Sequence, residues 1–259
     1  TGDEYLDKQQ LMDIQVLSTL GLTKDDIKAL GAQDNIERAV GAYCIDAWAG
    51  DLVAKAYSIT DGMNLLTVTS GRMPESPDEC IVDKNLLEKM KISVGDSITI
   101  DPSDDYEDCL THKNFTIVGT AVSPYYISVE RGSASIGSGN VRAYVYLPEG
   151  AFDLDYYTVA YAKVKGAQEL TAFTDEYDDY IDDVMDSLKD FGDRRAKLRY
   201  DDIIDEAQGK IDDAQKELDD KEKEADEKLS DAEQELKDAR RKLDKGWREY
   251  RDGKKELEE

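Results

Sequence analysis

Hydrophobic and polar positions follow two different patterns in the two parts of the chain. Up to about residue 190, short apolar runs are separated by Gly, Pro and β-branched residues. Beyond it Pro is absent, and Asp, Glu, Lys, Ala and Leu dominate. Short runs with turn residues are typical of strands and short helices, whereas an unbroken polar pattern with regular apolar positions is typical of one long helix. The pattern therefore predicts a globular part followed by a helical arm.

The first segment of the globular part predicts a β-α-β unit. Residues 14–23 have the composition of a strand, residues 23–30 that of a helix, and residues 40–48 that of a second strand. Thr23 stands at the N-cap and Asp26 at the third helical position, which is the spacing of a capping box. We expect the helix to begin at this box.

The last segment of the globular part predicts a strand and a helix that pack on the first segment. Residues 158–166 alternate like a strand. Apolar residues then recur at helical spacing, which gives one stripe that can cover a sheet: Leu170, Phe173, Tyr177, Ile181, Val184 and Leu188. The first and last segments together predict a split α/β layer.

Strands and turns dominate the region between these segments. A short helix is expected at 83–90, before the turn at Gly95 and Asp96. Strands are expected at 52–60, 65–71, 80–83, 96–101, 114–123 and 141–148. The fold class predicted is α+β: a split α/β subdomain (1–62 and 153–192) with an inserted β-rich subdomain (63–152), followed by a coiled-coil arm (193–259).

The arm has a spacing close to the heptad of coiled coils. The register slips near Lys221 and Glu222, and pairs such as Glu217 with Lys221, Glu224 with Lys228 and Glu233 with Lys237 support the helix at i, i+4. About 58 helical residues would reach about 87 Å, which suits either a rigid arm or a spacer. The predicted seam consists of Ala207, Ile211, Ala214, Leu218, Ala225, Leu229, Ala232, Leu236, Ala239 and Leu243.

Small residues narrow this seam towards the end of the chain. Ala232, Ala239, Gly246 and Gly253 share one heptad position, so only a closely packed second helix could fill the space beside them. For the chain alone we expect a weak homodimer through residues 211–257, because burial of several Leu side chains favours pairing.

Composition excludes some functions. The chain has 259 residues, 40% hydrophobic residues and a net charge of -26, so nucleic acid is not an expected partner. No stretch has the roughly 18 apolar residues of a membrane span. Because the chain starts without Met and stops within a repeating pattern, we expect it to be a piece of a longer protein whose membrane helices lie outside it.

Candidate catalytic and metal-binding motifs are incomplete. In the Gly- and Ser-rich stretch Ser138 stands where a phosphate loop needs Lys, and Ser135 lacks the glycine two positions earlier that a nucleophile elbow needs. His112 is the only histidine, and the Asp-rich groups lack the spacing of a calcium loop. The stretch is therefore interpreted as an uncharged loop between two strands. We assign no catalytic, cofactor or metal residue.

The three cysteines, Cys44, Cys80 and Cys109, have no CxxC spacing. A bridge between Cys80 and Cys109 is conceivable in an oxidising compartment, but three unpaired thiols are favoured over it.

The stretch "GRMPESPDECIVD" at 71–83, followed by "VGDSI" at 94–98, resembles a known family. It is similar to the extracytoplasmic core domain of FtsX-like, MacB-like ABC transporter permeases, and the resemblance looks strongest to large Gram-positive permeases with a coiled-coil insertion. The resemblance implies a porter-like subdomain for the split α/β part. It assigns structural roles to Gly71, Arg72, Pro74, Glu79, Gly95, Asp96, Gly119, Ser123, Pro124, Gly132, Gly137 and Gly139.

The resemblance also implies a function. The chain would be the extracellular, non-enzymatic domain of a permease subunit, and it would transmit ATP-driven conformational change to an extracellular protein or peptide. A separate cytoplasmic subunit would bind ATP, and helices outside this chain would cross the membrane. Another hypothesis is a surface-anchored adhesion protein with a coiled-coil stalk. A third, a hydrolase that uses His112, rests only on scattered carboxylates.

Overall fold

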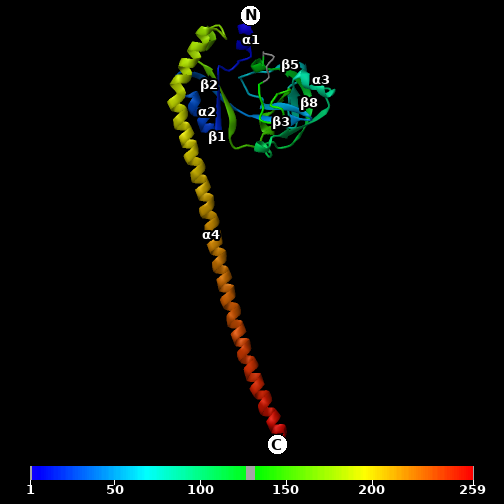
Figure 1. Cartoon of the computed structure of the whole chain (residues 1–259), viewed down its shortest axis with the longest axis vertical. Coiled ribbons are helices and arrows are strands. Elements are labelled where there is room, and N and C mark those ends of the chain that lie inside the picture. Colours follow the sequence, from blue (N-terminus) through cyan, green and yellow to red (C-terminus); the bar gives the residue numbers. More distant parts are fainter. Residues whose placement is uncertain (1, 127–131, 259) are drawn as a thin grey trace. The chain divides into compact units, whose positions relative to one another are not determined.

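The computed structural model describes residues 2–126 and 132–258, and it divides into two compact units, Thr1–Arg199 and Tyr200–Glu259. The first unit contains all the strands and short helices, and the long helix α4 (Asp175–Glu258) runs from the first unit through the second (Figure 1). This combination of mixed sheets and a long helix confirms the predicted α+β class. Among the described residues, no helix combines the length and the apolar character needed to cross a lipid bilayer.

A three-stranded antiparallel sheet is built from the two ends of the first unit. Its order is β1 (Ile14–Leu22), β10 (Tyr157–Val164) and β2 (Ile36–Ala42), so the last strand lies between the first two. Helix α2 (Lys24–Gly31) packs against it through Leu30. The short helix α1 (Gly2–Lys8) precedes the sheet.

Helix α2 begins at the predicted capping box. The Asp26 backbone N–H donates to Thr23 Oγ1 (3.2 Å), and the Thr23 N–H donates to Asp26 Oδ2 (2.7 Å). These bonds satisfy N–H groups that have no partner within the helix. The prediction is confirmed.

The other seven strands form a closed barrel with one additional strand. The sheet order is β5-β8-β6-β9-β4-β3-β7, and β7 also pairs with β8, which closes a ring. Helix α3 (Lys84–Met90) follows β6, and its Leu86 is fully buried. The strands are β3 (Cys44–Ala49), β4 (Leu52–Ser58), β5 (Thr67–Gly71), β6 (Glu79–Val82), β7 (Ser97–Pro102), β8 (Asn114–Val122) and β9 (Ala143–Leu147).

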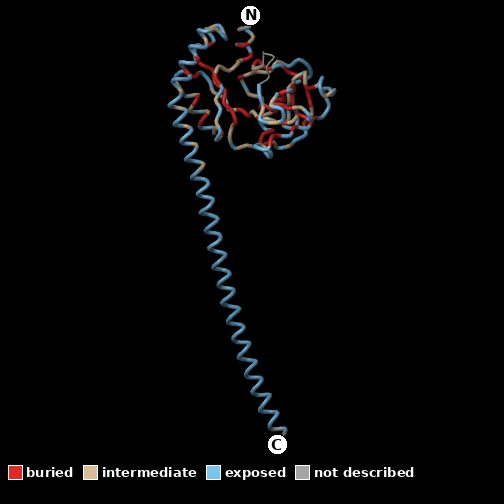
Figure 2. The backbone as a smooth tube through the Cα atoms, in the orientation of Figure 1, coloured by how far each residue is buried: buried red, intermediate tan, exposed pale blue. Residues whose placement is uncertain are grey.

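Side chains of these strands fill the inside of the barrel. Residues on β7 alternate between exposed and buried, as expected when one face of a strand points inward. Figure 2 shows that the buried residues lie in the first unit. Within the described part of the chain, four single-turn 3-10 helices connect the elements: η1 (Asp104–Tyr106), η2 (Pro124–Tyr126), η3 (Glu149–Ala151) and η4 (Ala167–Glu169).

The prediction of one strand over residues 40–48 was wrong. Strand β2 ends at Ala42, β3 begins at Cys44, and the two belong to different sheets. Tyr43 lies between them, and its backbone N–H donates to Ser58 Oγ (2.8 Å). Gly41, the turn-forming residue nearest the crossing, lies within β2 and is not one of the glycines with positive φ, so the nearly continuous apolar run 40–48 gives no clear sign of the crossing.

The predicted helical stripe began too early. Helix α4 begins at Asp175, whereas Leu170 follows η4 and Phe173 has a positive φ of 61° and is 70% exposed. Thr174 Oγ1 accepts the Tyr177 N–H at 3.4 Å, at the start of the helix. The remaining four stripe residues do pack on the three-stranded sheet, with Ile181 and Val184 buried. The helix is also continuous through residue 190, where the composition changes.

Two polar networks attach the part of α4 in the first unit to the three-stranded sheet and to helix α2. The carboxylate of Asp13 accepts hydrogen bonds from Lys163 Nζ (3.0 Å), the Val164 N–H (2.7 Å) and the Tyr177 hydroxyl (2.8 Å). Further along, Arg195 Nε donates to Asp26 Oδ1 (2.6 Å). Charged hydrogen bonds of this kind are stronger than neutral ones, so α4 is fixed to β1, β10 and α2.

The second unit is a single helix whose residues are exposed wherever their burial is described, apart from the half-buried Ile203 (Figure 2). The predicted pairs of Glu217 with Lys221 and Glu224 with Lys228 form. Strands β3 and β4 lie before residue 63 but pair within the seven-stranded sheet. The division at 62, 152 and 192 stays a prediction.

Candidate functional site

The glycines of the family motif allow two backbones to approach closely. Gly71, at the end of β5, has a φ of +72°, and a Cβ built there would lie 2.2 Å from the Val118 carbonyl oxygen. A Cβ on Gly119 would lie 2.6 Å from the Arg72 carbonyl oxygen. Neither position can hold a side chain without a backbone shift, so both glycines are required by the β5–β8 contact.

Next to these glycines, Arg72 and Glu79 form a two-pronged ion pair. Arg72 Nη1 and Nη2 donate to the two Glu79 oxygens at 2.7 and 2.5 Å, and the Glu75 N–H also donates to Glu79 (2.8 Å). The Arg72 hydrogen bonds are the main reason why the pKa of Glu79 falls to about 2. The pair closes the turn that contains Pro74, and it brings the start of β6 beside the end of β5.

Gly95 and Asp96 attach the neighbouring turn to β8. The Gly95 N–H donates to the Ile117 carbonyl oxygen (2.8 Å), and the Ile117 N–H donates to the Asp96 carbonyl oxygen (2.9 Å). The Asp96 side chain accepts the Ser93 N–H (2.8 Å). The first seven motif residues, Gly71, Arg72, Pro74, Glu79, Gly95, Asp96 and Gly119, therefore gather around β6 and β8.

Ser123 and Pro124 lie directly after β8. Both are buried, and Ser123 Oγ accepts the Tyr125 N–H (3.2 Å). They lie beside the tyrosine pocket described below.

The described part of the Gly- and Ser-rich stretch contacts β3 and β4. Ser135 donates to Asp46 Oδ2 from both its N–H (2.5 Å) and its hydroxyl (2.9 Å). A Cβ on Gly137 would lie 2.6 Å from Val53 and 2.9 Å from Trp48. Gly132 and Gly139 also have positive φ. Residues 127–131 of this stretch lie outside the described residues.

The Asp46 carboxylate also pairs with Lys55 on β4, at 2.7 Å. Burial alone would raise the pKa of Asp46, but the hydrogen bonds from Lys55 and Ser135 lower it. Asp46 thus binds the loop as an ionised anchor.

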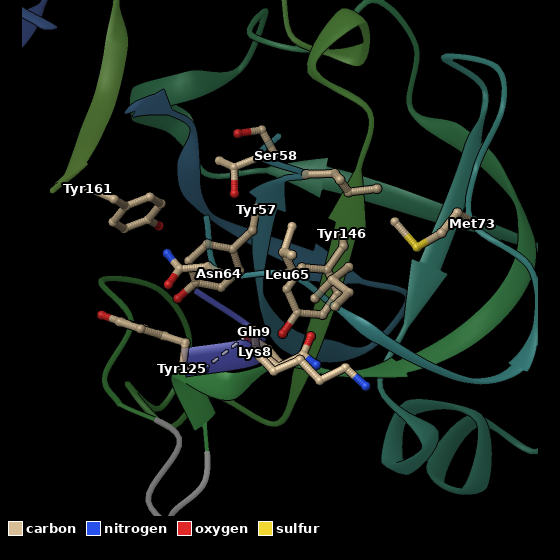
Figure 3. Close-up of a pocket in the computed structure, with 14 residues that line it drawn as sticks. Lys8, Gln9, Tyr57, Ser58, Asn64, Leu65, Met73, Tyr125, Tyr146 and Tyr161 are labelled. Carbon is tan, nitrogen blue, oxygen red and sulfur yellow. Dashed lines mark hydrogen bonds between the residues drawn. The ribbon is translucent and has the colours of Figure 1, made fainter. Parts of the chain in front are cut away.

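A pocket rich in tyrosine lies between the three-stranded sheet and the barrel (Figure 3). Its cavity volume is about 340 Å³. Tyr57, Tyr146 and Tyr161 come from β4, β9 and β10, and Tyr125 comes from η2. The remaining lining residues are Lys8, Gln9, Ser58, Ile59, Thr60, Asn64, Leu65, Leu66, Met73 and Ser123.

The walls of this tyrosine pocket are largely aromatic. The rings of Tyr57 and Tyr146 stack with centroids 5.9 Å apart. Burial raises the pKa of Tyr125 and Tyr161, so both stay neutral at physiological pH. The Tyr125 hydroxyl donates to Gln15 Oε1 (3.0 Å). Aromatic walls with hydroxyl groups and the ammonium of Lys8 suit the binding of a ligand.

Sequence analysis missed this pocket. The available signal was the alternation in "VRAYVYLP", which places Tyr144 and Tyr146 on the same face of a strand. Its other walls come from segments far apart in the chain.

A compact junction connects the two sheets next to the pocket. The rings of Tyr43 and Phe152 stack with centroids 4.7 Å apart, and Tyr43 also contacts Tyr157. The Cys44 N–H donates to Thr158 Oγ1 (2.7 Å), which in turn donates to the Cys44 carbonyl oxygen (3.1 Å). The chain passes between the two sheets twice, from β2 to β3 and from β9 to β10, and this one group of side chains holds both crossings.

The residues of the hydrolase hypothesis have structural contacts. His112 lies against the Phe115 ring, 5.4 Å between centroids, while Ser135 binds Asp46. Cys44, Cys80 and Cys109 are free thiols. Within residues 2–126 and 132–258, no group of three or more His, Cys, Asp or Glu could hold a metal ion.

Comparison with known proteins gives similarity at the level of structure. No family model matches the chain, and no curated protein matches it. The chain is similar to the extracellular domain of the noncanonic ABC-type transporter YknZ from Gram-positive bacteria, at 16% identity and a TM-score of 0.37, over 65% of this chain and 86% of that one.

Two further solved structures are similar to the chain. The periplasmic region of MacB from Actinobacillus actinomycetemcomitans has 12% identity and a TM-score of 0.36, over 64% of this chain and 74% of that one. A domain of a putative permease from Porphyromonas gingivalis has 14% identity and a TM-score of 0.34, over 71% and 73%. All three belong to transporters or permeases, the class of protein that the sequence motifs resemble.

Proposed function

We propose that this chain is the extracellular domain of an ABC transporter permease subunit, and that it acts mechanically rather than as an enzyme. It passes movement generated by a cytoplasmic ATP-binding subunit, through membrane helices outside this chain, to an extracellular protein or peptide. The observation that carries the proposal is the run 71–83 together with its geometry. Gly71, Arg72 and Glu79 in this run all serve to hold β5, β6 and β8 together, which supports a mechanical rather than a catalytic role.

The route of the chain supports this proposal. The three-stranded sheet takes β1 and β2 from one end of the first unit and β10 from the other, with the whole barrel between them. The two ends of the unit therefore meet in one sheet, and a displacement of either end moves that sheet directly. This agrees with the split subdomain and inserted β-rich part that the family resemblance implies.

The junction supports movement as one body. Two chain crossings, the stacked rings of Tyr43 and Phe152, and the reciprocal hydrogen bonds between Cys44 and Thr158 connect the sheets. A single crossing could act as a hinge, whereas two crossings held by buried contacts oppose independent rotation. The first unit should therefore transmit force without bending between its sheets.

The first experiment tests location. In intact cells that make the parent protein, Glu88→Cys on the exposed side of α3 should react with a membrane-impermeant maleimide. Leu86→Cys, two positions away on the buried side of the same helix, is the matched control and should react only after unfolding. Labelling of Glu88→Cys only in lysed cells would contradict an extracellular position.

The second experiment tests the partner. Purification of the tagged parent protein in mild detergent should bring with it a subunit that binds and hydrolyses ATP. A surface-anchored adhesion protein would be labelled from outside in the same way but would purify without an ATPase. Absence of an ATPase would therefore overturn the proposal even if the location were confirmed.

A further inference from the structure

Polar side chains in the wall of the tyrosine pocket lack the hydrogen bonds that buried groups usually make. Tyr161 is 4% exposed, and none of the described residues forms a hydrogen bond with its hydroxyl. Gln9 is 8% exposed, and its side-chain amide has no hydrogen-bond partner within residues 2–126 and 132–258. The large majority of buried polar side chains in folded proteins are hydrogen-bonded, so unpaired groups around a cavity indicate a place for a ligand.

The side chain of Asn64 offers a further unpaired group. Its Oδ1 accepts the Met12 N–H (3.0 Å), whereas no acceptor in the part of the chain that the structure describes bonds its Nδ2. The Asn64 N–H donates to the Gln10 carbonyl oxygen (2.9 Å). The Leu65 N–H donates to the Gln9 carbonyl oxygen (2.8 Å). The backbone around Gln9 and Asn64 is therefore held in place while their amide groups stay available to a ligand.

The charge of the pocket is opposite to that of the chain. Lys8 is exposed and forms no ion pair with a described residue, and none of the described residues that line the pocket is Asp or Glu. The chain as a whole has a net charge of -26. A cation without a nearby counter-charge favours an anion at this place. Burial raises the pKa of Tyr161, so its hydroxyl keeps its proton at neutral pH and can donate to that anion.

The size and the walls of the pocket suit one aromatic ring. Its volume of about 340 Å³ lies near the lower end of the range of small-molecule sites, which is about 300–1000 Å³. Figure 3 shows the Tyr161 hydroxyl directed into the pocket and Met73 on the opposite side, with Tyr146 and Leu65 between them. An aromatic ring packs favourably against tyrosine rings and a thioether sulfur. The pocket therefore has a polar end and an apolar end.

We propose that the tyrosine pocket binds a small carboxylate that carries one aromatic ring. The carboxylate accepts hydrogen bonds from the Tyr161 hydroxyl and the Asn64 amide, and the ring packs between the tyrosine side chains and Met73. Lys8 favours the anion through its charge. The site lies within the first unit, and the proposal does not rest on the proposed function.

Three probes with the same ring test the chemistry of the ligand. Phenylacetate, phenylacetamide and phenethylamine differ in the charge of the head group, and an NMR titration of the whole chain measures the binding of each. Phenylacetate should bind with a dissociation constant on the order of 1 mM, as expected for so small a ligand. The amide should bind at least about fivefold more weakly, and the amine at least about tenfold more weakly.

Other results of this comparison would overturn the proposal. Tighter binding of phenethylamine would mean that the tyrosines form a site for cations. Equal binding of the three probes would mean that only the apolar walls bind. Absence of any shift with about 20 mM phenylacetate would mean that the pocket holds no ligand of this class.

Removal of the unpaired hydroxyl tests the position of the carboxylate. Tyr161→Phe should weaken phenylacetate binding at least about fivefold, since it removes one hydrogen bond to a charged group. The midpoint of urea unfolding should stay unchanged, because this hydroxyl bonds none of the described residues. Tyr106→Phe, on η1 and outside the pocket, is the matched control and should change the affinity by less than about twofold. Equal affinities of the two variants would overturn the proposal.

Asn64→Asp separates an effect on charge from a general loss of structure. Aspartate keeps an oxygen for the Met12 N–H but replaces the donor by a negative charge. Phenylacetate should bind at least about tenfold more weakly, and phenethylamine should become the tighter of the two. A damaged fold would weaken both probes, so only a reversed preference supports the proposal. An unchanged preference would place the carboxylate elsewhere and overturn it.

The contribution of Lys8 is measured in the same way. Lys8→Gln should reduce the preference for phenylacetate over phenylacetamide at least about twofold at low salt, and the difference should shrink at high salt. Lys24→Gln, which removes an exposed lysine at the start of α2, is the matched control and should leave the preference unchanged. Equal effects of the two variants would show only the general charge of the chain and would contradict the role of Lys8.

Discussion

Asp13 offers the sharpest test of how the long helix is fastened to the three-stranded sheet. Its carboxylate is 4% exposed and accepts hydrogen bonds from Lys163, Val164 and Tyr177. The Lys163 side chain is itself only 10% exposed, and its remaining acceptor is the Leu11 carbonyl oxygen (2.8 Å). Replacing Asp13 by Ala would leave a buried ammonium group without a counterion.

The expected loss follows from the cost of such a charge. Breaking a buried ion pair by removal of one partner costs about 3–5 kcal/mol. For a domain of this size, about 2–4 °C of Tm is lost per kcal/mol, so Asp13→Ala should lower Tm by about 6–20 °C. Tyr177→Phe removes one hydrogen bond to a carboxylate that keeps two others, and should cost about 1.5 kcal/mol.

Urea unfolding followed by Trp48 fluorescence measures these differences. Trp247→Phe should be included in every variant, because Trp247 is the other tryptophan and lies in the second unit. The double variant Asp13→Ala, Lys163→Met removes both charges and should recover at least half of the lost stability. If Asp13→Ala alone costs less than about 1 kcal/mol, or the double variant recovers nothing, the pair is not desolvated and the reasoning fails.

Three further predictions concern other contacts. Burial alone would raise the pKa of Asp26, but hydrogen bonds from Thr23 and Arg195 lower it. The ionised Asp26 carboxylate therefore stabilises the folded protein above its ordinary pKa of 3.8, and this stabilisation is lost as the pH falls below that value. Asp26→Asn should flatten acid unfolding in that range, and an unchanged profile would contradict it. Gly71→Ala should destabilise the barrel by several kcal/mol more than Gly95→Ala, as measured by urea unfolding. The reason is that a Cβ added at Gly71 would collide with the Val118 carbonyl oxygen, whereas a Cβ added at Gly95 would meet no atom of a non-neighbouring residue within 4 Å. Burial raises the pKa of the Cys80 thiol to about 12, so iodoacetamide at pH 7 should modify it, as judged by mass spectrometry, only in unfolded protein.

Elements with local signals were predicted from the sequence, and elements decided by tertiary contacts were not. The capping box of Thr23 and Asp26 needs only neighbouring residues, and the structure contains it. Strands β2 and β3 separate at Tyr43, whose backbone N–H donates to Ser58, fifteen residues away, and Gly41, the nearest turn-forming residue, lies within β2 and so gives no clear signal of the break. The start of α4 was misplaced for a similar reason, since Phe173 fits the helical spacing but adopts a positive φ.

The candidate site was predictable only in part. Gly71, Arg72, Pro74 and Glu79 could be grouped because they stand within nine residues of one another. The tyrosine pocket could not, because Lys8, Tyr57, Tyr125, Tyr146 and Tyr161 come from five elements that meet only after folding. Apart from the strand alternation that includes Tyr146, its residues are common types with no fixed spacing, so a pattern along the chain does not bring them together.

The position of β10 in the middle of the three-stranded sheet sets the order in which the first unit can fold. Ile14 on β1 pairs with Ala162 on β10, and β2 meets the other edge of the same strand. Closing so long a loop is entropically costly and slow, whereas all strands of the barrel are already present in the chain before Tyr157. As the chain is synthesised, the barrel can close while β1 and β2 still expose unpaired edges. Until β10 fills this gap, those two edges are the part of the nascent chain most open to aggregation and to a chaperone that binds extended strands.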